Sequence, residues 1–516
     1  MWKVVGIADK ITNFSCKNIT NPTKSCQLAK LTAFICFDKI KSDKKQEIKY
    51  RKSDDEDNGM EDCKKLIVNG KVVFPDGVRE VSLLIKNETI AGVLKKGVFP
   101  KEPCEVIDAA GKIVMAGMID THNHMADPGP YNFREDWYCG SCSAASGGIT
   151  TICDMPLPSV PATINKEGFI RKRDTASASS VVDFAFWGGL IPSSIPDMEE
   201  MHQLGCVGFK GFMCFATKEY PRITDGYLVD GMKQAASFGG LIALHAENAE
   251  AAEFGCRHYS EANCKDEAQF DQARPWWTEY DAIRRATLFA NMTKARLLIC
   301  HTTIAQGAEF LRDAKKEGAP VYVETCPHYL IFDHDILREK KSFAKCTPPF
   351  RSRENVEKMW EYVKDGTIDV LGSDHGPFTD EEKVMQKDFW KEYCGFGCND
   401  VMLSAMISEG VGKRGLSWSR LFALTSANAA KILGLYPKKG SLMPGADADI
   451  IFIDPNERWI YDGSKSFSKT KSVKGPYQGM ELTGRVTDTF VRGNRVFGDG
   501  TIYAQAGYGK LVNGAE

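Results

Sequence analysis

The sequence of 516 residues lacks a strong charge of either sign and lacks any long apolar run. Its net charge at pH 7 is −2, which gives no electrostatic reason to expect nucleic acid or an anionic membrane as a partner. No apolar run reaches the roughly 20 residues needed to cross a bilayer, and the first residues do not form a secretory segment with a cleavage site. We therefore expect a cytoplasmic protein that binds neither nucleic acid nor membrane.

The sequence also lacks the regular cysteine spacing of a disulfide-stabilised secreted domain. Its 17 cysteines are scattered, which favours reduced thiols in the cytoplasm. Cys139 and Cys142 form a Cys-x-x-Cys pair, but no second such pair completes a zinc site. Their surroundings of Ser, Ala and Gly favour an ordinary helical stretch over a redox motif.

The two ends of the chain differ from its middle. Residues 1–59 are rich in lysine and end in an acidic run, so we expect a poorly ordered extension. Residues 60–112 and 437–516 contain short alternating apolar runs, and we expect them to pair into one composite β domain. Residues 69–70 are Asn-Gly between two apolar runs, which predicts a β-hairpin turn.

The middle of the chain, residues 113–436, alternates short apolar runs with helical stretches. Eight of these runs are candidate strands: Ile113–Ile119, Thr150–Asp154, Val182–Trp187, Gly205–Met213, Gly240–His245, Arg296–His301, Val321–Thr325 and Asp369–Asp374. Eight strand–helix units over about 250 residues predict an α/β protein with a (β/α)8 TIM barrel. An open doubly wound sheet is less favoured, because no glycine-rich dinucleotide turn follows the first strand.

Side chains that bind metals occur near the ends of these runs. His122 and His124 point to the same side of a strand, because residues i and i+2 do so. Each candidate alone would more often be a core or loop residue. A barrel, however, gathers the carboxyl ends of its strands at one mouth, where the other units contribute Lys210, His245, His301 and Asp374. Four imidazoles and a carboxylate suit Zn²⁺ or a neighbouring first-row divalent ion.

Lys210 is the exception in this set, because an ammonium group is repelled by cations and cannot bind one. If the amine adds CO₂, it becomes an anionic carbamate whose two oxygens can bridge two metal ions. The set then fits a binuclear centre of the kind that two-metal hydrolases use. A water molecule between two divalent ions loses a proton near neutral pH and becomes a nucleophile.

This order of residues resembles the amidohydrolase superfamily, and within it the cyclic amidohydrolases: hydantoinases and dihydropyrimidinases, allantoinases and dihydroorotases. The resemblance spans roughly residues 64–510. It implies that Asp374 also carries a proton from the water to the leaving nitrogen. It further implies two divalent ions, with zinc as the expected metal. The resemblance assigns His122, His124 and Asp374 to the more buried ion, His245 and His301 to the other, and carboxylated Lys210 to the bridge.

Two positions bear on the choice among cyclic amides. Dihydroorotases usually carry an arginine two residues after the His pair, where this chain has Ala126, and Arg134 is a weak substitute. Hydantoinases typically have a tyrosine after the bridging lysine, where Phe215 has no hydroxyl to stabilise an oxyanion. Several segments resemble allantoinases instead, although Gly376 departs from their usual serine: 127–129, 147–163, 324–329, 345–351 and 372–377.

The resemblance also suggests substrate contacts from Phe215, Cys346, Pro348 and His328, although segment 345–351 equally fits a rigid Pro-Pro turn. The sequence predicts a hydrolase that opens a small-molecule cyclic ureide, with allantoin to allantoate as the first candidate. One alternative is a hydantoinase or dihydropyrimidinase. Another is a non-catalytic scaffold related to dihydropyrimidinase, which the complete set of metal ligands disfavours. The resemblance finally implies a homotetramer.

Overall fold

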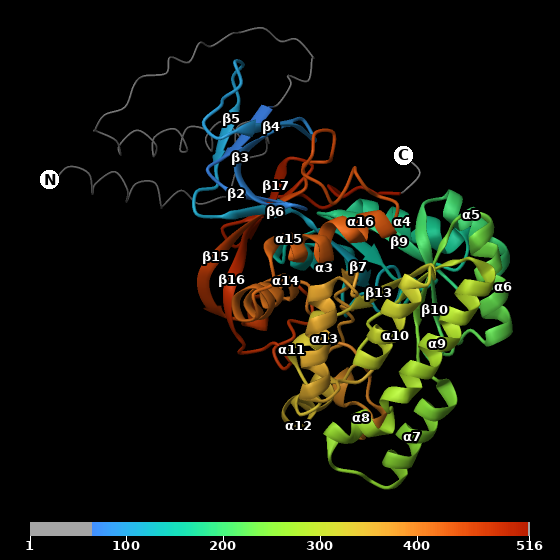
Figure 1. Ribbon diagram of the computed structural model, residues 1–516. Helices are drawn as coiled ribbons and strands as arrows, with labels where there is room; N and C mark the ends of the chain where they lie inside the picture. Colours follow the sequence, from blue (N-terminus) through green and yellow to red (C-terminus); the bar gives the residue numbers. More distant parts are fainter. Residues whose placement is uncertain (1–63, 514–516) are drawn as a thin grey trace, which may run out of the picture. The chain divides into compact units, whose positions relative to one another are not determined.

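The computed structural model describes residues 64–513, so the predicted extension of residues 1–59 lies outside the described residues (Figure 1). An eight-stranded parallel sheet curves into a nearly closed barrel. This confirms the predicted (β/α)8 fold class. The strands, in the order in which they lie side by side, are β7 (Met118–Asn123), β8 (Ile149–Asp154), β9 (Asp183–Gly189), β10 (Cys206–Phe212), β11 (Leu241–His245), β12 (Arg296–Ile299), β13 (Val321–Thr325) and β14 (Val370–Leu371).

Helices connect these strands and cover the outside of the barrel (Figure 1). Side-chain caps fix several helix starts; for example, Asn165 accepts a hydrogen bond from the backbone N–H of Gly168. The helices are α3 (Trp137–Ser146), α4 (Lys166–Ser179), α5 (Met198–Gln203), α6 (Asp225–Ser237), α7 (Ala249–Glu261), α8 (Phe270–Ala273), α9 (Trp276–Thr293), α10 (Ala305–Lys316), α11 (Pro327–Ile331), α12 (Ile336–Lys340), α13 (Arg353–Asp365), α14 (Met402–Met406), α15 (Trp418–Phe422) and α16 (Asn428–Ile432).

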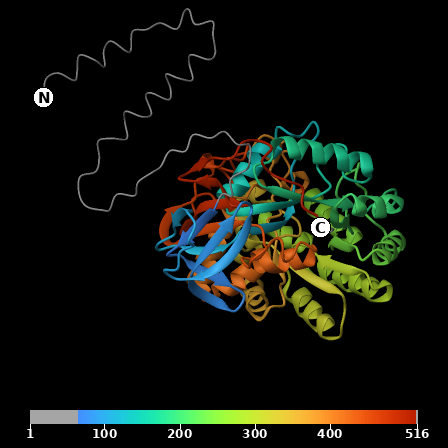
Figure 2. The ribbon, with the colours of Figure 1, turned by 90° about the horizontal axis from the view of Figure 1, so that it is seen from above.

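A separate ten-stranded mixed sheet is built from both ends of the described chain. Strand β6 pairs with β15 in antiparallel register, with Ile113 opposite Ile453. The strands coloured blue and red therefore lie side by side in Figures 1 and 2. The strands are β1 (Lys64–Val68), β2 (Lys71–Phe74), β3 (Gly77–Lys86), β4 (Thr89–Lys95), β5 (Glu105–Asp108), β6 (Ile113–Ala116), β15 (Ile450–Ile460), β16 (Glu481–Val491), β17 (Asn494–Gly498) and β18 (Thr501–Ile502).

The predicted strand Ile113–Ile119 is in fact two strands in different sheets. Its first half is β6 of the mixed sheet, and the chain enters the barrel as β7 only after Gly117. A side chain at Gly117 would overlap Thr150, and the backbone N–H of Gly117 donates to the carbonyl of Asp449 at 3.0 Å. A continuous apolar run does not reveal this break, because both halves are buried.

The predicted hairpin at residues 69–70 is wrong. Both β1 and β2 pair with β3, and the register continues from Ile67 opposite Leu83 to Lys71 opposite Glu80. Asn69 has φ 63°, so it forms an irregularity between two collinear strands, while the hairpin turn lies after Phe74. Asn-Gly supplies the left-handed conformation that both a hairpin turn and a bulge require.

A buried ion cluster joins the start of β9 to the mixed sheet. The ammonium of Lys439, which is 1% exposed, lies 2.5 Å from Asp183, 2.9 Å from Asp447 and 2.7 Å from Asp449. Arg492, directly after β16, also pairs with Asp183. Burial would lower the pKa of Lys439, but Asp449 and Asp447 raise it, so the lysine stays charged.

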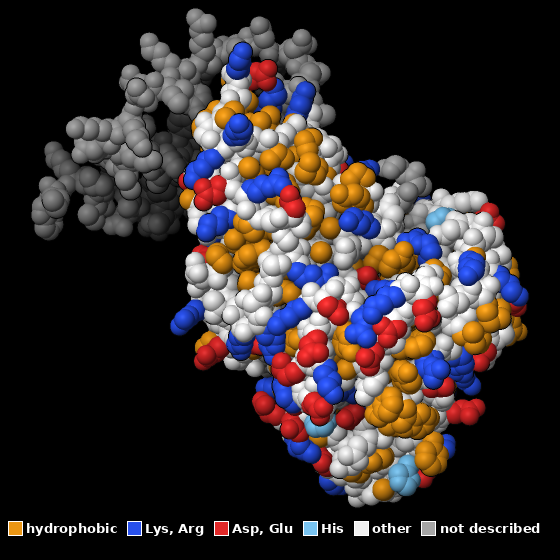
Figure 3. All heavy atoms as spheres, in the orientation of Figure 1, with side chains coloured by type: hydrophobic (Ala, Val, Ile, Leu, Met, Phe, Trp, Pro, Cys, Tyr) orange, Lys and Arg blue, Asp and Glu red, His pale blue; other side chains and the backbone are white. Residues whose placement is uncertain are grey.

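The surface mixes both signs of charge. On the face shown in Figure 3, Lys and Arg side chains are interspersed with Asp and Glu. Within residues 64–513, no helix combines the length and the apolar character that a bilayer crossing requires. The cysteines in the same range form no disulfide bonds with one another.

We predict that Lys439→Met lowers the free energy of unfolding by about 3–5 kcal/mol, because it leaves buried carboxylates without their cation. Chemical denaturation measures this change. Lys358→Met is the matched control: it removes a lysine from an exposed pair with Glu354 on α13 and should leave stability nearly unchanged. Equal effects of the two substitutions would contradict the role of the cluster.

Candidate metal centre

The His pair lies at the end of β7 and faces a carboxylate from the end of the last barrel unit. The Nε2 atoms of His122 and His124 are 3.3 and 3.4 Å from Oδ1 of Asp374. Burial would raise the pKa of Asp374, but the two imidazoles hold it below its usual range. An ionised carboxylate and two imidazole nitrogens therefore converge on one point, as a divalent cation requires.

Backbone hydrogen bonds between β7 and the segment after β14 bring these residues together. The N–H of Asp374 donates to the carbonyl of His122 at 2.9 Å, and the N–H of His124 donates to the carbonyl of His375 at 2.9 Å. Asn123 and His375 form a parallel bridge. Below them, Ser373 donates its N–H and hydroxyl to the buried carboxylate of Asp120. We call this set of contacts the β7–β14 seam.

His245 and His301 complete a row of four imidazoles. The ring centres of His122 and His301 are 5.2 Å apart, and those of His245 and His301 are 4.5 Å apart. Burial, with the nearby His245 and Lys210, lowers the pKa of His301 well below its usual value. A neutral imidazole is the form that binds a metal ion, and Nδ1 of His301 is buried without a hydrogen-bond partner among the described residues.

Lys210 lies inside the barrel on β10, where the sequence places it among apolar residues. Its side chain is fully buried, and its Nζ has no hydrogen-bond partner among the described residues. The ring of Phe212 lies 4.9 Å from its Nζ. Burial and the charge of Lys210 both lower the pKa of His122. An unpaired amine buried beside imidazoles is costly as an ammonium.

Two buried glutamates orient the imidazoles, and sequence reasoning missed both. Glu324 at the end of β13 lies 2.8 Å from Nδ1 of His122 and accepts from the backbone N–H of His301. Glu247 lies 2.6 Å from Nε2 of His245 and pairs with Arg274. These contacts leave Nε2 of His122 and Nδ1 of His245 for a metal ion. The position of Glu324 at a strand end is the signal that could have identified it.

The predicted substrate contacts lie in different surroundings. Phe215 is 60% exposed, whereas Cys346 and His328 are buried. The carbonyl of Pro348 already accepts a hydrogen bond from the hydroxyl of Tyr329 at 2.7 Å. Both ring nitrogens of His328 lack a partner among the described residues, and burial lowers its pKa to about 4. His328 is therefore a neutral group with an unused donor and an unused acceptor.

Arg134 is not a surface loop residue. Its guanidinium pairs with both oxygens of Glu382 and lies 4.5 Å from the rings of Tyr131 and Phe378. It thus ties the loop after β7 to the loop after β14. A guanidinium held in this way is not free to bind a substrate carboxylate.

Comparisons with known proteins agree with this geometry. A model of the amidohydrolase family matches residues 113–496. An L-hydantoinase of Paenarthrobacter aurescens is 34% identical over 450 residues, which cover 87% of this chain and 97% of the relative. An allantoinase of Escherichia coli K12 is 33% identical over 437 residues, which cover 84% of this chain and 94% of the relative. The solved L-hydantoinase from Arthrobacter aurescens superposes with a TM-score of 0.84 at 34% identity, covering 87% of this chain and 99% of that one.

We predict that Glu324→Gln weakens divalent-metal binding by about 10- to 100-fold, because the amide no longer satisfies all the donors around His122. Metal titration followed by elemental analysis measures the affinity. The control is Glu357→Gln, which alters an exposed glutamate paired with Arg414. Wild-type metal affinity in Glu324→Gln would count against the orienting role.

Proposed function

The chain belongs to the amidohydrolase family, as a cyclic amidohydrolase of the hydantoinase and allantoinase group, and we propose from this premise that it hydrolyses allantoin to allantoate. The observation that carries the proposal is the gathering of four imidazoles, a buried unpaired lysine and an aspartate at one end of the barrel. Metal-dependent hydrolysis accounts for every residue in this set.

We propose that these residues hold two divalent ions, with Zn²⁺ as the first candidate. His122, His124 and Asp374 would bind one ion, and His245 and His301 the other. Lys210, carrying a CO₂-derived carbamate, would lie between them. Bound divalent ions would polarise the ring carbonyl and acidify water. The buried, unpaired amine of Lys210 supports the carbamate, because that modification removes an uncompensated positive charge from the site.

Asp374 is the proposed proton carrier. In the reaction, water adds its oxygen to the ring carbonyl carbon, and the bond from that carbon to the ring nitrogen breaks. The proton released by water passes to the carboxylate of Asp374 and then to the departing nitrogen, so the product is a ureido acid. The neighbouring imidazoles hold the pKa of Asp374 below its usual range, so its carboxylate is ionised, and its side chain is 19% exposed.

We propose an uncharged cyclic ureide because the two positions considered for binding a substrate carboxylate, residues 126 and 134, offer no unpaired arginine or lysine. Ala126 takes the place two residues after the His pair, and Arg134 is engaged by Glu382. Dihydroorotate, which carries a carboxylate, is therefore disfavoured. Phe215, without a hydroxyl, further favours allantoin over hydantoins. A hydantoinase remains the second candidate, because the chain is 34% identical to the L-hydantoinase and 33% identical to the allantoinase.

We also propose the wider organisation expected from the sequence. The boundary predicted at residue 113 moves to Gly117, because β6 pairs with β15: residues 64–116 and 437–513 would form the composite β domain, and residues 117–436 the catalytic barrel. The enzyme would work as a homotetramer in the cytoplasm. The free cysteines within residues 64–513 support a reducing compartment.

A parallel assay of allantoin, hydantoin, dihydrouracil and dihydroorotate tests the substrate. We expect kcat/KM to be highest for allantoin in metal-loaded protein. A higher value for hydantoin or dihydrouracil would select the second candidate. Native protein that contains no divalent metal and hydrolyses none of the four would support the scaffold alternative instead.

We predict that Asp374→Asn keeps most of its metal but loses turnover by at least about 100-fold, because the amide cannot carry a proton. Steady-state kinetics and elemental analysis on the same sample measure both quantities. Substantial remaining hydrolysis at full metal content would rule out the proton-carrier role.

We predict that Lys210→Ala loses both metal ions and turnover, because the bridging group is gone. Short carboxylic acids added with metal should restore part of the activity, since a free carboxylate can occupy the space of the carbamate. Mass spectrometry of the intact wild-type protein under mild conditions should detect the added CO₂. Full metal content in untreated Lys210→Ala would contradict the bridge.

A further inference from the structure

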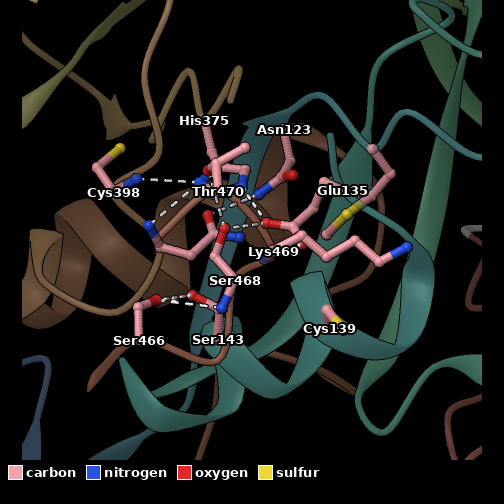
Figure 4. Close-up of polar contacts among 12 residues, drawn as sticks. Asn123, Glu135, Cys139, Ser143, His375, Cys398, Ser466, Ser468, Lys469 and Thr470 are labelled. Carbon is pink, nitrogen blue, oxygen red and sulfur yellow. Dashed lines mark hydrogen bonds and ion pairs between the residues drawn. The ribbon is translucent and has the colours of Figure 1, made fainter. Parts of the chain in front are cut away.

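A buried polar network outside the set of proposed metal ligands surrounds Glu135 and His375 (Figure 4). Its centre is Glu135, which is fully buried in the segment before α3. Oε2 of Glu135 is 3.3 Å from Nε2 of His375, the residue that follows Asp374. The proposed function uses neither of these two residues.

The hydrogen bonds fix the protonation of His375. Its Nδ1 accepts from the backbone N–H of Cys398 at 3.0 Å and lies 3.4 Å from that of Asn399. Because a backbone N–H can only donate, Nδ1 carries no proton, and the ring proton is on Nε2. The ring therefore donates this proton to Glu135 and is held from both sides.

A distant segment of the chain supplies the other donors to Glu135. In the connection between β15 and β16, Ser468 donates its hydroxyl to Oε2 of Glu135. The backbone N–H of Lys469 donates to Oε1 at 3.0 Å. Glu135 thus accepts three donors, and Figure 4 shows Ser468, Lys469 and His375 converging on it. The carboxylate of Glu135 thus links the β15–β16 connection of the mixed sheet to His375, the residue after Asp374.

Asp374 needs external support because of its backbone. Its φ of 49° is in the left-handed region, which is strained for a non-glycine residue and persists only if its neighbours fix it. The backbone of His375 is held at both ends, by Ser373 Oγ at its N–H and by the N–H of His124 at its carbonyl. The ring of His375 is the remaining anchor, and Glu135 holds that ring.

We propose that Glu135 is a positioning residue, which acts through His375 and with Ser468 to hold the carboxylate of Asp374 in the orientation for proton transfer. The inference rests on the proposed role of Asp374. It makes the β15–β16 connection part of the catalytic apparatus, although no residue of that connection contacts the proposed metal ligands directly.

The kinetic test compares Glu135→Gln and Ser468→Ala with wild type, using metal-loaded full-length protein. Each should lower kcat by about 10- to 100-fold, with KM and metal content close to wild type. Because both act through His375, the double variant should fall little further than the stronger single variant. Ser464→Ala is the matched control, since its hydroxyl donates to the exposed carboxylate of Asp462 in the same connection; it should keep wild-type kcat.

Two kinetic results would overturn the inference. One is wild-type kcat in Ser468→Ala, which decides the matter even if Glu135→Gln does not fold. The other is parallel loss of kcat and metal, since that would indicate general disruption of the site.

Crystal structures of wild type and Ser468→Ala separate this inference from the proposed function, because they require no substrate. We expect the ring of His375 to leave its 3.3 Å contact with Glu135 in the variant, and the carboxylate of Asp374 to rotate while its backbone contacts stay in place. If wild type hydrolyses no substrate yet the variant shows this change, the proposed function fails and the positioning role stands. An unchanged Asp374 in the variant overturns the positioning role.

Discussion

The β7–β14 seam is the constraint on which the candidate site depends. Strand β14 is only two residues long, so the barrel closes through the hydrogen bonds of the segment that follows it. The same bonds place Asp374 against the two imidazoles of the His pair. Barrel closure and assembly of the centre are therefore one event. The buried carboxylate of Asp120 accepts hydrogen bonds within the seam, and the buried carboxylate of Glu135 contacts the ring of His375 next to it.

The distribution of buried charges distinguishes the site from the rest of the barrel. Lys439 lies among three carboxylates, and Lys172 donates to Asp154 at 2.6 Å. Arg274 pairs with Glu247. In each case the chain supplies its own counter-ion, as buried charges require. The buried amines of Lys345 and Lys383 donate to backbone carbonyls instead. Lys210 differs from all of these, because its amine has no hydrogen-bond partner among the described residues. That difference is the structural reason for expecting a chemical modification there.

The sequence was sufficient to predict the barrel and to predict that the six candidate ligands lie near one another, because strand ends of a barrel converge whatever lies between them. It was insufficient where the same short sequence pattern is compatible with two different local backbone conformations. Asn69 supplied a left-handed residue that fits either a turn or an irregular strand, and only the pairing with β3 distinguishes them. Gly117 divides one apolar run between two sheets. Glu135 and Ser468 are far apart in the chain, and no local pattern joins them.

The mixed sheet has a consequence for how the molecule is made. Its central pairing of β6 with β15 joins residues separated by most of the described chain. Loops of that length close slowly, and a nascent chain folds from its N-terminal side as it emerges. The first strands must therefore wait for β15 and β16 to be synthesised, with their apolar edge exposed meanwhile. The barrel strand that carries the His pair continues directly from β6, so a protein interrupted before residue 450 would contain every proposed metal ligand and still lack the partner that fixes the first of them.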